Sequence, residues 1–547
     1  MSNVNKGRNI MKNRIINTIQ SEATETELQG IDRRHFLGGA GLLALSGATV
    51  ALTGCAPNID NAGVPDSNNS PNNDDTSTTA EIFQPDETLS CDIVVVGAGG
   101  SGLAAAVQAS ELGASVICVE SQGAAGGNLN GVEGCFGIGS DMQRERDITI
   151  DPGETIRSEL SASQFRASGL GYVDMVHASG ENIDWLVEQG VQFSDIDADK
   201  GDILVFHRFG NRGMQDYVQP MVTQAESNGV TFLYETKGEQ LIVEGGRVTG
   251  CYATQNDDKV LQINARAVIL ATGGFADNDE YLGEMGLAPD KIRRGGLPGH
   301  DGSGHEMAIA AGALSNRPDT ALLAAFYVNG TPGYYEEGKF AFVIGVAAPY
   351  SIWLNEKGER YVNEDFTGAN IMLMSLPYRQ NKDNFVVMDT TMMSIFLGGD
   401  PETDDQVASG IAEGSIFKAD TTSALANAIK LDAEVFASTV ERYNGFVQTG
   451  SDQDYGKSPD VLMPLVNGPF YAIKPILEVN TTIGSIKTDR SFCAIDSNQN
   501  PIDGLYVVGV EGAMLWANVY TINVSGGCNA NNVNSGRTAA KDAIAKL

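Results

Sequence analysis

The residues Cys91-Asp92-Ile93-Val94-Val95-Val96 run directly into Gly97-Ala98-Gly99-Gly100-Ser101-Gly102, and this stretch decides the fold. A short β-branched run of this kind is typical of a parallel strand that is buried on both faces. Leu103-Ala104-Ala105-Ala106-Val107 follows as the start of a helix, and Ala114 to Glu120 form a second apolar run that ends in an acid. This order of strand, glycine turn, helix, strand and acid predicts a dinucleotide-binding unit.

Each glycine of the turn, the start of the helix and the final acid has a physical role in binding a dinucleotide. Gly97 permits the tight turn, Gly99 lets the backbone approach a pyrophosphate, and Gly102 allows close packing of helix on strand. The helix N-terminus offers free amides and a positive dipole end to phosphate, and the acid can accept hydrogen bonds from a ribose. The predicted cofactor contacts of this unit are Gly97, Ala98, Gly99, Gly100, Ser101, Gly102 and Glu120.

The segment before this unit indicates export. Arg33 and Arg34 precede an apolar run from Leu37 to Leu52, which glycines interrupt and which is short for a membrane span. The pattern resembles a twin-arginine export signal. Leu52-Thr53-Gly54-Cys55 resembles a lipoprotein cleavage box, so Cys55 would become the lipidated N-terminus of the mature chain. An uncleaved N-terminal anchor is the alternative.

A polar stretch separates this signal from the folded body. Residues 56–89 are mostly Asn, Asp, Ser, Thr and Pro, a composition that cannot bury a core. We therefore predict a signal peptide over residues 1–54 and a disordered tether over residues 55–90. The expected location is the extracytoplasmic face of the cell membrane, with the chain anchored by lipid.

Charge and cysteine usage exclude several classes of function. The formal net charge of −34 argues against nucleic acid, whose phosphates would be repelled. Apart from Cys55, the cysteines are scattered and form no CxxC or CxxCH, so no zinc, iron–sulfur or c-type haem site is predicted. They are Cys91, Cys118, Cys135, Cys251, Cys493 and Cys528.

Further glycine-rich segments continue the cofactor pattern along the chain. They are Gly126-Gly127-Asn128, the strand-to-turn segment Ala267 to Gly274, Gly504 to Gly509, and Val524 to Asn531. Together with the first turn they resemble the fumarate reductase/succinate dehydrogenase flavoprotein family, whose relatives include urocanate reductases, aspartate oxidases and ketosteroid dehydrogenases. The resemblance covers about Asp92 to the end of the sequence and implies FAD as cofactor. The FAD contacts that it adds are Gly126, Gly127, Asn128, Ala271, Thr272, Gly273, Gly509, Glu511, Gly526, Gly527 and Cys528.

The resemblance also implies an architecture. The fold class would be α/β, with a Rossmann-like FAD-binding domain split by an inserted α+β capping domain. Residues 91–315 and 476–547 would form the two parts of the FAD-binding domain, and residues 316–475 would form the cap. The substrate would lie between cap and flavin, since ligand sites favour domain interfaces.

Two local features refine the expected flavin site. Val524 to Asn531 reads as a glycine turn into a final helix that reaches about Ala545. In the family such a helix points its first amides at the flavin pyrimidine edge, where a positive dipole end stabilises negative charge; an ordinary capped helix is the alternative. Covalent members of the family use a histidine after the first unit, but Gly126 to Gly139 contains none, so we expect FAD held without a covalent bond.

The sequence departs from fumarate reductases at the substrate site. Their proton-donating arginine corresponds to Gly368, their histidine pair to Asn480-Thr481, and their late arginine to Val524. These groups clamp a dicarboxylate and supply the proton, so their absence predicts a substrate other than fumarate.

Two tyrosines are the candidate replacements. Tyr520 lies between the late flavin strand and the final helix, and Tyr350 precedes the cap motif Trp353 to Glu364. A tyrosine hydroxyl can donate a proton or bind a carbonyl oxygen as charge develops. A packed ring with a satisfied hydroxyl is the alternative for both tyrosines. Four other aromatic residues would line an apolar pocket or belong to the core: Trp516, Tyr327, Phe326 and Phe342.

These features predict an FAD-dependent oxidoreductase that reduces an activated carbon–carbon double bond of the enoate or enone type. Hydride would pass from flavin N5 to the β-carbon and a proton would reach the α-carbon. A dehydrogenase of the ketosteroid type and a non-catalytic binding lipoprotein are the alternatives. Because the chain has a single dinucleotide fingerprint and neither haem nor iron–sulfur motifs, we expect electrons from a separate haem or FMN redox protein.

Overall fold

The computed structural model describes residues 83–198, 203–333, 349–365, 375–512, 515–516, 518–521 and 523–547. The chain divides into the units Met1–Ile82 and Phe83–Leu547, and every described residue belongs to the second unit. The expected signal and most of the tether, with Arg33, Arg34 and Cys55, therefore lie outside the described residues.

The end of the expected tether is folded. Glu87–Ser90 form strand β1, which pairs in parallel with β10 (Val260–Asn264). The prediction of a tether to residue 90 is therefore wrong for this strand. The reason is that the backbone groups of β1 continue the edge of a sheet, and its Leu89 packs against buried apolar residues.

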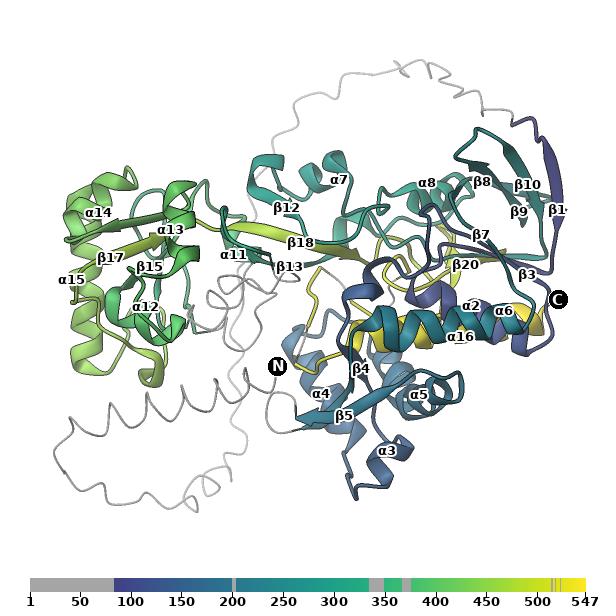
Figure 1. Cartoon of the computed structure of the whole chain (residues 1–547), viewed down its shortest axis with the longest axis horizontal. Helices are drawn as coiled ribbons and strands as arrows, with labels where there is room; N and C mark the ends of the chain where they lie inside the picture. Colours follow the sequence, from purple (N-terminus) through teal and green to yellow (C-terminus); the bar gives the residue numbers. More distant parts are fainter. Residues whose placement is uncertain are drawn as a thin grey trace, which may run out of the picture. The chain divides into compact units, whose positions relative to one another are not determined.

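A six-stranded sheet carries the glycine turn (Figure 1). Its strands, in order across the sheet, are β19 (Cys493–Ile495), β20 (Pro501–Val507), β11 (Ala267–Leu270), β2 (Ile93–Val96), β3 (Val116–Val119) and β7 (Thr231–Leu233). Neighbours are parallel except β19 with β20. Because β11 pairs with β20 in the register Leu270↔Val507, segments far apart in sequence complete one sheet.

Two helices from opposite ends of the cofactor domain cover this sheet together. Helix α2 (Gly100–Glu111) packs along α16 (Gly527–Ala545), and α6 (Gln219–Ser227) also packs against α2. The crossing of α2 and α16 is close, because a Cβ on Gly536 would lie 2.4 Å from the carbonyl oxygen of Ser101. The predicted end of the final helix at about Ala545 is confirmed.

Smaller elements complete the cofactor domain. A second sheet has the order β1-β10-β9-β8 and a third the order β4-β6-β5. Their remaining strands are β8 (Thr236–Glu244), β9 (Arg247–Gln255), β4 (Gly134–Phe136), β5 (Phe193–Ala198) and β6 (Leu204–Phe209). The helices are α3 (Asp141–Arg144), α4 (Pro152–Ala162), α5 (Gly169–Glu188), α7 (Asp279–Glu284) and α8 (Ser303–Ala310), and short turns are η1 (Gly127–Gly131), η2 (Met214–Val218), η3 (Pro289–Lys291) and η4 (Arg317–Asp319).

The cap is an α+β insertion. Its sheet has the order β14 (Ile352–Asn355), β15 (Asn384–Asp389), β17 (Phe470–Ile473) and β16 (Ile416–Ala419), with all neighbours antiparallel. Its helices are α11 (Ser375–Tyr378), α12 (Thr390–Leu397), α13 (Asp405–Ala412), α14 (Thr422–Ala428) and α15 (Ala433–Thr449), with the short turn η7 (Pro459–Val461).

A three-stranded sheet connects cap and cofactor domain. It has the order β12 (Ile292–Arg294), β18 (Ile476–Ile483) and β13 (Ala321–Tyr327). The Phe326 ring of β13 packs on Trp353 of the cap, and Thr482 of β18 accepts a hydrogen bond from the amide of Phe275 beside β11. The predicted fold class, a Rossmann-like domain split by an α+β cap, is confirmed.

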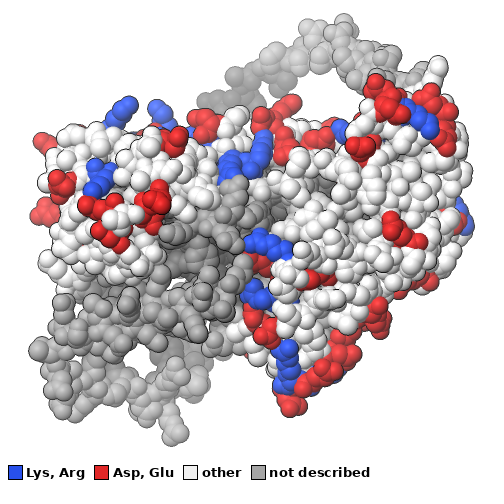
Figure 2. Space-filling view, viewed as in Figure 1, with Lys and Arg blue, Asp and Glu red and all other residues white. Residues whose placement is uncertain are grey.

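Charged side chains of both signs lie on the surface of the described residues. On the face drawn in Figure 2, acidic side chains are spread over the surface and several basic side chains lie beside them. The described ion pairs include Arg144–Asp141 and Arg294–Asp279. Among the described residues, no helix combines the length and the apolar character needed to cross a membrane.

Candidate active site

The turn between β2 and α2 has the geometry of a phosphate cradle. Gly97 has a φ of 102°, and a Cβ there would lie 2.5 Å from the carbonyl oxygen of Ala271. A Cβ on Gly102 would lie 1.9 Å from the carbonyl oxygen of Gly97. Gly99 differs, because no described atom lies within 4 Å of a Cβ built on it. The described residues give α2 no side-chain cap, so its first amides are left for a ligand.

Glu120 ties this turn to the end of β3. Its buried carboxylate accepts hydrogen bonds from the amide of Ala98 at 2.8 Å and from the amide of Gln122 at 2.8 Å. A carboxylate has about four acceptor positions, so two amides leave capacity for ribose hydroxyls. The arrangement fits the dinucleotide that the sequence predicts.

The second glycine pair lies against the first turn. Gly126 and Gly127 have φ of 124° and 48°, and Gly126 forms a parallel bridge with Gly99. Asn128, a predicted cofactor contact, donates to the carbonyl oxygen of Asn480 at 2.9 Å and accepts from the amide of Leu297 at 2.7 Å. Its amide therefore fastens the glycine pair to β18.

Glu511 has a similar fastening role. Its carboxylate is fully buried and accepts from the Thr272 hydroxyl at 2.9 Å and from the Gly274 amide at 2.7 Å, and also from the Ser485 hydroxyl. These bonds join the turn after β11, which contains Ala271, Thr272 and Gly273, to the C-terminal part of the cofactor domain. Direct contact of this carboxylate with a cofactor stays a prediction.

The start of α16 is a glycine corner. Gly526 has a φ of 81°, and a Cβ there would lie 2.5 Å from the amide nitrogen of Phe136. As at α2, the described residues provide no side-chain cap, and Gly527 opens the helix. Gly509 lies nearby in the fold, since its amide donates to Ser535 of α16 at 2.9 Å.

Tyr520 lies at this helix end. The residue is 6% exposed, its ring packs edge-on against Trp516 at 4.9 Å, and the backbone amide of Cys528 hydrogen-bonds to its hydroxyl. Burial raises the pKa of Tyr520 well above its usual value. The structure thus brings together three predicted elements, namely Tyr520, the glycine corner and Cys528, and places a phenol hydroxyl on the first turn of α16.

Tyr350 has different surroundings. It is half-buried in the cap, its ring lies 5.4 Å from that of Phe396, and burial together with Asp365 and Asp460 raises its pKa. Phe326 belongs to the core between Trp353 and Tyr378, and Tyr327 is covered by the guanidinium of Arg293 at 4.4 Å. Phe342 and Gly368 lie outside the described residues.

Sequence reasoning missed a buried acid beside Tyr520. Glu159 of α4 is 1% exposed and accepts from the Tyr172 hydroxyl at 3.1 Å and from the Val524 amide at 3.0 Å. The Thr521 hydroxyl also donates to it. One signal was available: Glu159 lies four residues after Thr155 on the buried face of an otherwise polar helix.

The positions that differ from fumarate reductases lie beside the glycine turns. Thr481 donates to the carbonyl oxygen of Gly273 at 3.4 Å. Asn480 is 5% exposed, and its Oδ1 has no hydrogen-bond partner among the described residues. Val524 is buried next to Glu159. These side chains are neutral, so this part of the site offers hydrogen bonds and apolar surface in place of fixed positive charge.

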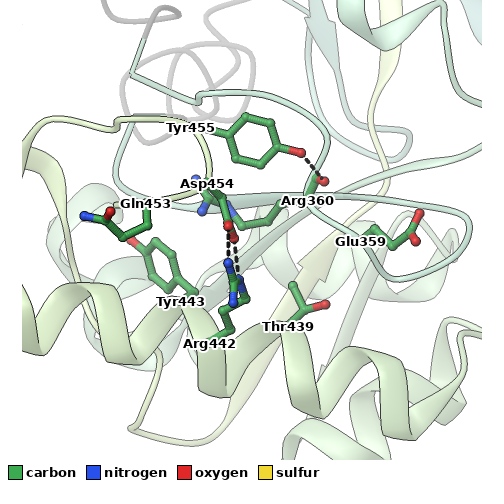
Figure 3. A pocket seen from close by; sticks show the side chains of 8 residues that line it. All are labelled: Glu359, Arg360, Thr439, Arg442, Tyr443, Gln453, Asp454 and Tyr455. Carbon is green, nitrogen blue, oxygen red and sulfur yellow. Dashed lines mark hydrogen bonds and ion pairs between the residues drawn. The ribbon is translucent and has the colours of Figure 1, made fainter. Parts of the chain in front are cut away.

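A separate hollow of about 400 Å³ lies between Glu359 and Arg360 of the cap motif, helix α15 and the residues 453–455 that follow this helix (Figure 3). Arg360 binds Glu364 at 2.7 Å and Asp452 at 3.0 Å with all three side chains buried, and Arg442 pairs with Asp454. Lys457 donates to the carbonyl oxygen of Ser351 at 2.6 Å, and burial lowers its pKa to about 8. Because the charges compensate one another, we interpret this cluster as support for the cap.

Comparison with known proteins adds independent findings. The family described as FAD binding domain matches residues 92–527. The chain is 30% identical over 489 residues to the vinyl phenol reductase of Lactiplantibacillus plantarum, which covers 83% of this chain and 96% of that protein. It is 27% identical over 474 residues to the cytochrome fumarate reductase of Shewanella frigidimarina, covering 84% of this chain and 77% of that protein.

A solved structure has a similar fold. The 3-ketosteroid-Δ4-(5α)-dehydrogenase of Rhodococcus jostii RHA1 superposes with a TM-score of 0.66 at 24% identity, covering 85% of this chain and 99% of that protein.

Proposed function

The chain belongs to the FAD-binding domain family, and from that premise we propose that it reduces a carbon–carbon double bond conjugated to an aromatic ring or a carbonyl group. The predicted cofactor is confirmed: the protein is an FAD-dependent oxidoreductase acting on CH–CH groups. The observation that carries the proposal is the buried hydroxyl of Tyr520 on the first turn of α16, where a proton donor is available without an arginine.

The residues of the cofactor domain have distinct tasks in this proposal. Bound FAD, once reduced, supplies a hydride to one alkene carbon. Gly99 leaves room for the pyrophosphate, and Glu120 accepts from the ribose. Tyr520 donates its proton to the other alkene carbon and regains one from solvent, so the alkene gains two hydrogens in total. The amides at the start of α16 favour negative charge near this end of the helix.

A neutral substrate fits the neutral side chains of this site. Asn480, Thr481 and Val524 stand where fumarate reductases carry charged or basic groups, and a dicarboxylate without such partners would lose its charge-assisted hydrogen bonds. A relative of nearly the same span is a vinyl phenol reductase. We therefore propose vinyl phenols, enoate esters and enones as the substrate class.

The substrate test compares alkenes under one electron donor. Anaerobic protein with reduced methyl viologen should oxidise the dye with a vinyl phenol, an enone or an enoate ester, and more slowly with fumarate. Tyr520→Phe should lower kcat by about 100-fold while FAD stays bound, because a general acid contributes roughly 10²–10⁴ in rate. Tyr455→Phe, which removes a hydroxyl in the hollow of the cap, is the control. Faster turnover of fumarate than of any neutral alkene would contradict the proposal.

We further propose that FAD is held without a covalent bond and is reduced by a separate haem or FMN redox protein. The support is the sequence, which has no CxxCH, no cysteine cluster and a single dinucleotide fingerprint. Mild acid should release the flavin from the polypeptide. NADH should not reduce the bound flavin, whereas a low-potential dye should; rapid reduction by NADH would contradict this part.

Export and anchoring complete the proposal. They are supported by Arg33 and Arg34 followed by Cys55. Changing both arginines to lysine should trap the protein in the cytoplasm, which fractionation would detect. Export that persists after this change would exclude the twin-arginine route.

A further inference from the structure

Helix α4 contributes a buried acid to the loop that carries Tyr520. We propose that Glu159 is a positioning residue, which holds this loop so that the Tyr520 hydroxyl stays on the first turn of α16. The inference rests on the proposed function for its activity readout, and on the hydrogen-bond network for everything else.

The network connects α4, α5 and the loop before α16. Glu159 Oε2 accepts from the hydroxyls of Tyr172 and Thr521, and Glu159 Oε1 accepts from the Val524 amide at 3.0 Å. The loop is thereby bound to a single carboxyl group on both sides of Asn523. Removing this group would leave the buried Thr521 hydroxyl, Tyr172 hydroxyl and Val524 amide without this acceptor.

One hydrogen bond and one ring contact connect Tyr172 to Tyr520. The Trp516 Nε1 donates to the Tyr172 hydroxyl at 2.8 Å, and the Trp516 ring packs edge-on against Tyr520 at 4.9 Å. All three aromatic side chains are buried. A shift of Tyr172 would therefore move Trp516 and, with it, the ring that must present its hydroxyl to the Cys528 amide.

The oxygen atoms of the network lie close together. Glu159 Oε2, the Tyr172 hydroxyl and the Thr521 hydroxyl form a closed triangle of contacts, with 3.1 Å between Glu159 and Tyr172 and 2.8 Å between Tyr172 and Thr521. Trp516 can only donate, so it adds no acceptor to the triangle. Glu159 Oε2 is therefore an acceptor on which both hydroxyls converge.

Three titratable groups lie around Glu159. They are Tyr172 of α5, Tyr520 of the loop and Cys528 of α16, and burial raises the pKa of each above its usual value. A glutamine keeps an oxygen that can accept from the Val524 amide and adds a donor. It should therefore replace Glu159 better than an apolar residue of similar size.

The experiment compares Glu159→Leu, Glu159→Gln and the control Glu154→Gln on the holoenzyme. Glu154 lies on the same helix with a side chain that is 68% exposed. We expect Glu159→Leu to retain FAD and KM but to lower kcat by about 100-fold, since small misplacement of a reacting group costs that much. Glu159→Gln should recover most of kcat, and Glu154→Gln should match the unaltered protein.

A second readout needs no substrate. The emission of Trp516, one of 3 tryptophans, is obtained as the difference between each variant and its Trp516→Phe counterpart. It should shift in Glu159→Leu and stay unchanged in Glu159→Gln. If the protein reduces no alkene but shows this shift, the positioning role is supported and the proposed function is excluded.

Two results would overturn the inference. One is a Glu159→Leu protein with unaltered kcat and Trp516 emission, and the other is a Glu159→Gln protein as defective as Glu159→Leu. Should Glu159→Leu not fold, Tyr172→Phe keeps the ring and removes one hydroxyl of the triangle. It should lower kcat by about tenfold, the equivalent of one hydrogen bond, and an unaltered kcat would again overturn the role.

Discussion

Helices α2 and α16 begin in the same way, but their first turns have different surroundings. Each starts on a glycine without a side-chain cap from the described residues, and the two helices pack against each other. The first turn of α2 stays open, because a Cβ on Gly99 would meet no described atom within 4 Å. The first turn of α16 is closed by Tyr520 and by the backbone of Phe136. One uncapped helix start is therefore open, and the other is in contact with a protein hydroxyl.

The largest expected effect is a loss of FAD binding without a loss of stability, caused by a change at the open first turn of α2. Gly99→Leu should abolish bound FAD, because the side chain would fill the space through which the backbone approaches the pyrophosphate. The apoprotein should unfold at an unchanged temperature, since no described protein atom is displaced. Flavin absorbance per polypeptide and thermal unfolding of the apoprotein measure the two quantities.

The control for this change is Gly445→Leu on α15, where a Cβ likewise meets no described atom within 4 Å. That variant should keep FAD in full. A Gly99→Leu protein that still binds FAD would show that the open side of α2 is not the phosphate site.

A change at the closed first turn of α16 should lower the stability of the protein. Gly526→Ala puts a Cβ 2.5 Å from the Phe136 amide nitrogen at a φ of 81°. We expect the free energy of unfolding to fall by about 3 kcal/mol from left-handed strain and overpacking together. Chemical denaturation of the apoprotein measures this. Gly445→Ala, in the interior of α15 where a Cβ meets no described atom within 4 Å, should instead stabilise by about 0.5–1 kcal/mol.

The same contrast shows how far sequence reasoning reaches. The turn at Gly97, the strands around it and the end of α16 could be predicted because glycine spacing and apolar runs act over a few residues. Glu159 could not be found in this way, because its partner Thr521 lies 362 residues away.

The cap shows the same limit of sequence analysis, which does not identify side-chain partners that are distant in sequence. Resemblance identified its motif, but the partners of Arg360 include Asp452, which only the tertiary fold brings near. Likewise, the sequence assigned Asn128 and Glu511 to the cofactor, and the structure adds that their side chains hold segments of the protein together. Motif matching finds where a cofactor domain is built, but it does not separate contacts with the ligand from contacts that hold the turn.

A smaller effect on FAD affinity is expected for Glu120, which accepts a hydrogen bond from the turn before α2. Glu120→Gln keeps the shape of the side chain but replaces a charged acceptor of the Ala98 amide with a neutral one. Charge-assisted hydrogen bonds are about twice as strong as neutral ones, so FAD affinity should fall by about tenfold. Titration of apoprotein with FAD measures the dissociation constant. An unchanged constant would assign Glu120 to the turn alone and leave the ribose without this partner.

The smallest expected effect concerns the pH dependence of kcat, which ionisation of Tyr520 at the start of α16 should leave unchanged. A helix N-terminus and the Cys528 amide favour the phenolate of Tyr520 and lower its pKa, whereas burial favours the neutral phenol and raises it. Burial is the larger cause, so the pKa of Tyr520 lies well above 10 and the phenol keeps its proton throughout the working range. The kcat for a vinyl phenol should therefore show no alkaline limb from Tyr520 up to about pH 10, the ordinary pKa of a tyrosine. An alkaline limb near pH 8 or 9 that disappears in Tyr520→Phe would show that the helix end outweighs burial, and that the first turn of α16 still acts as an anion site like that of α2.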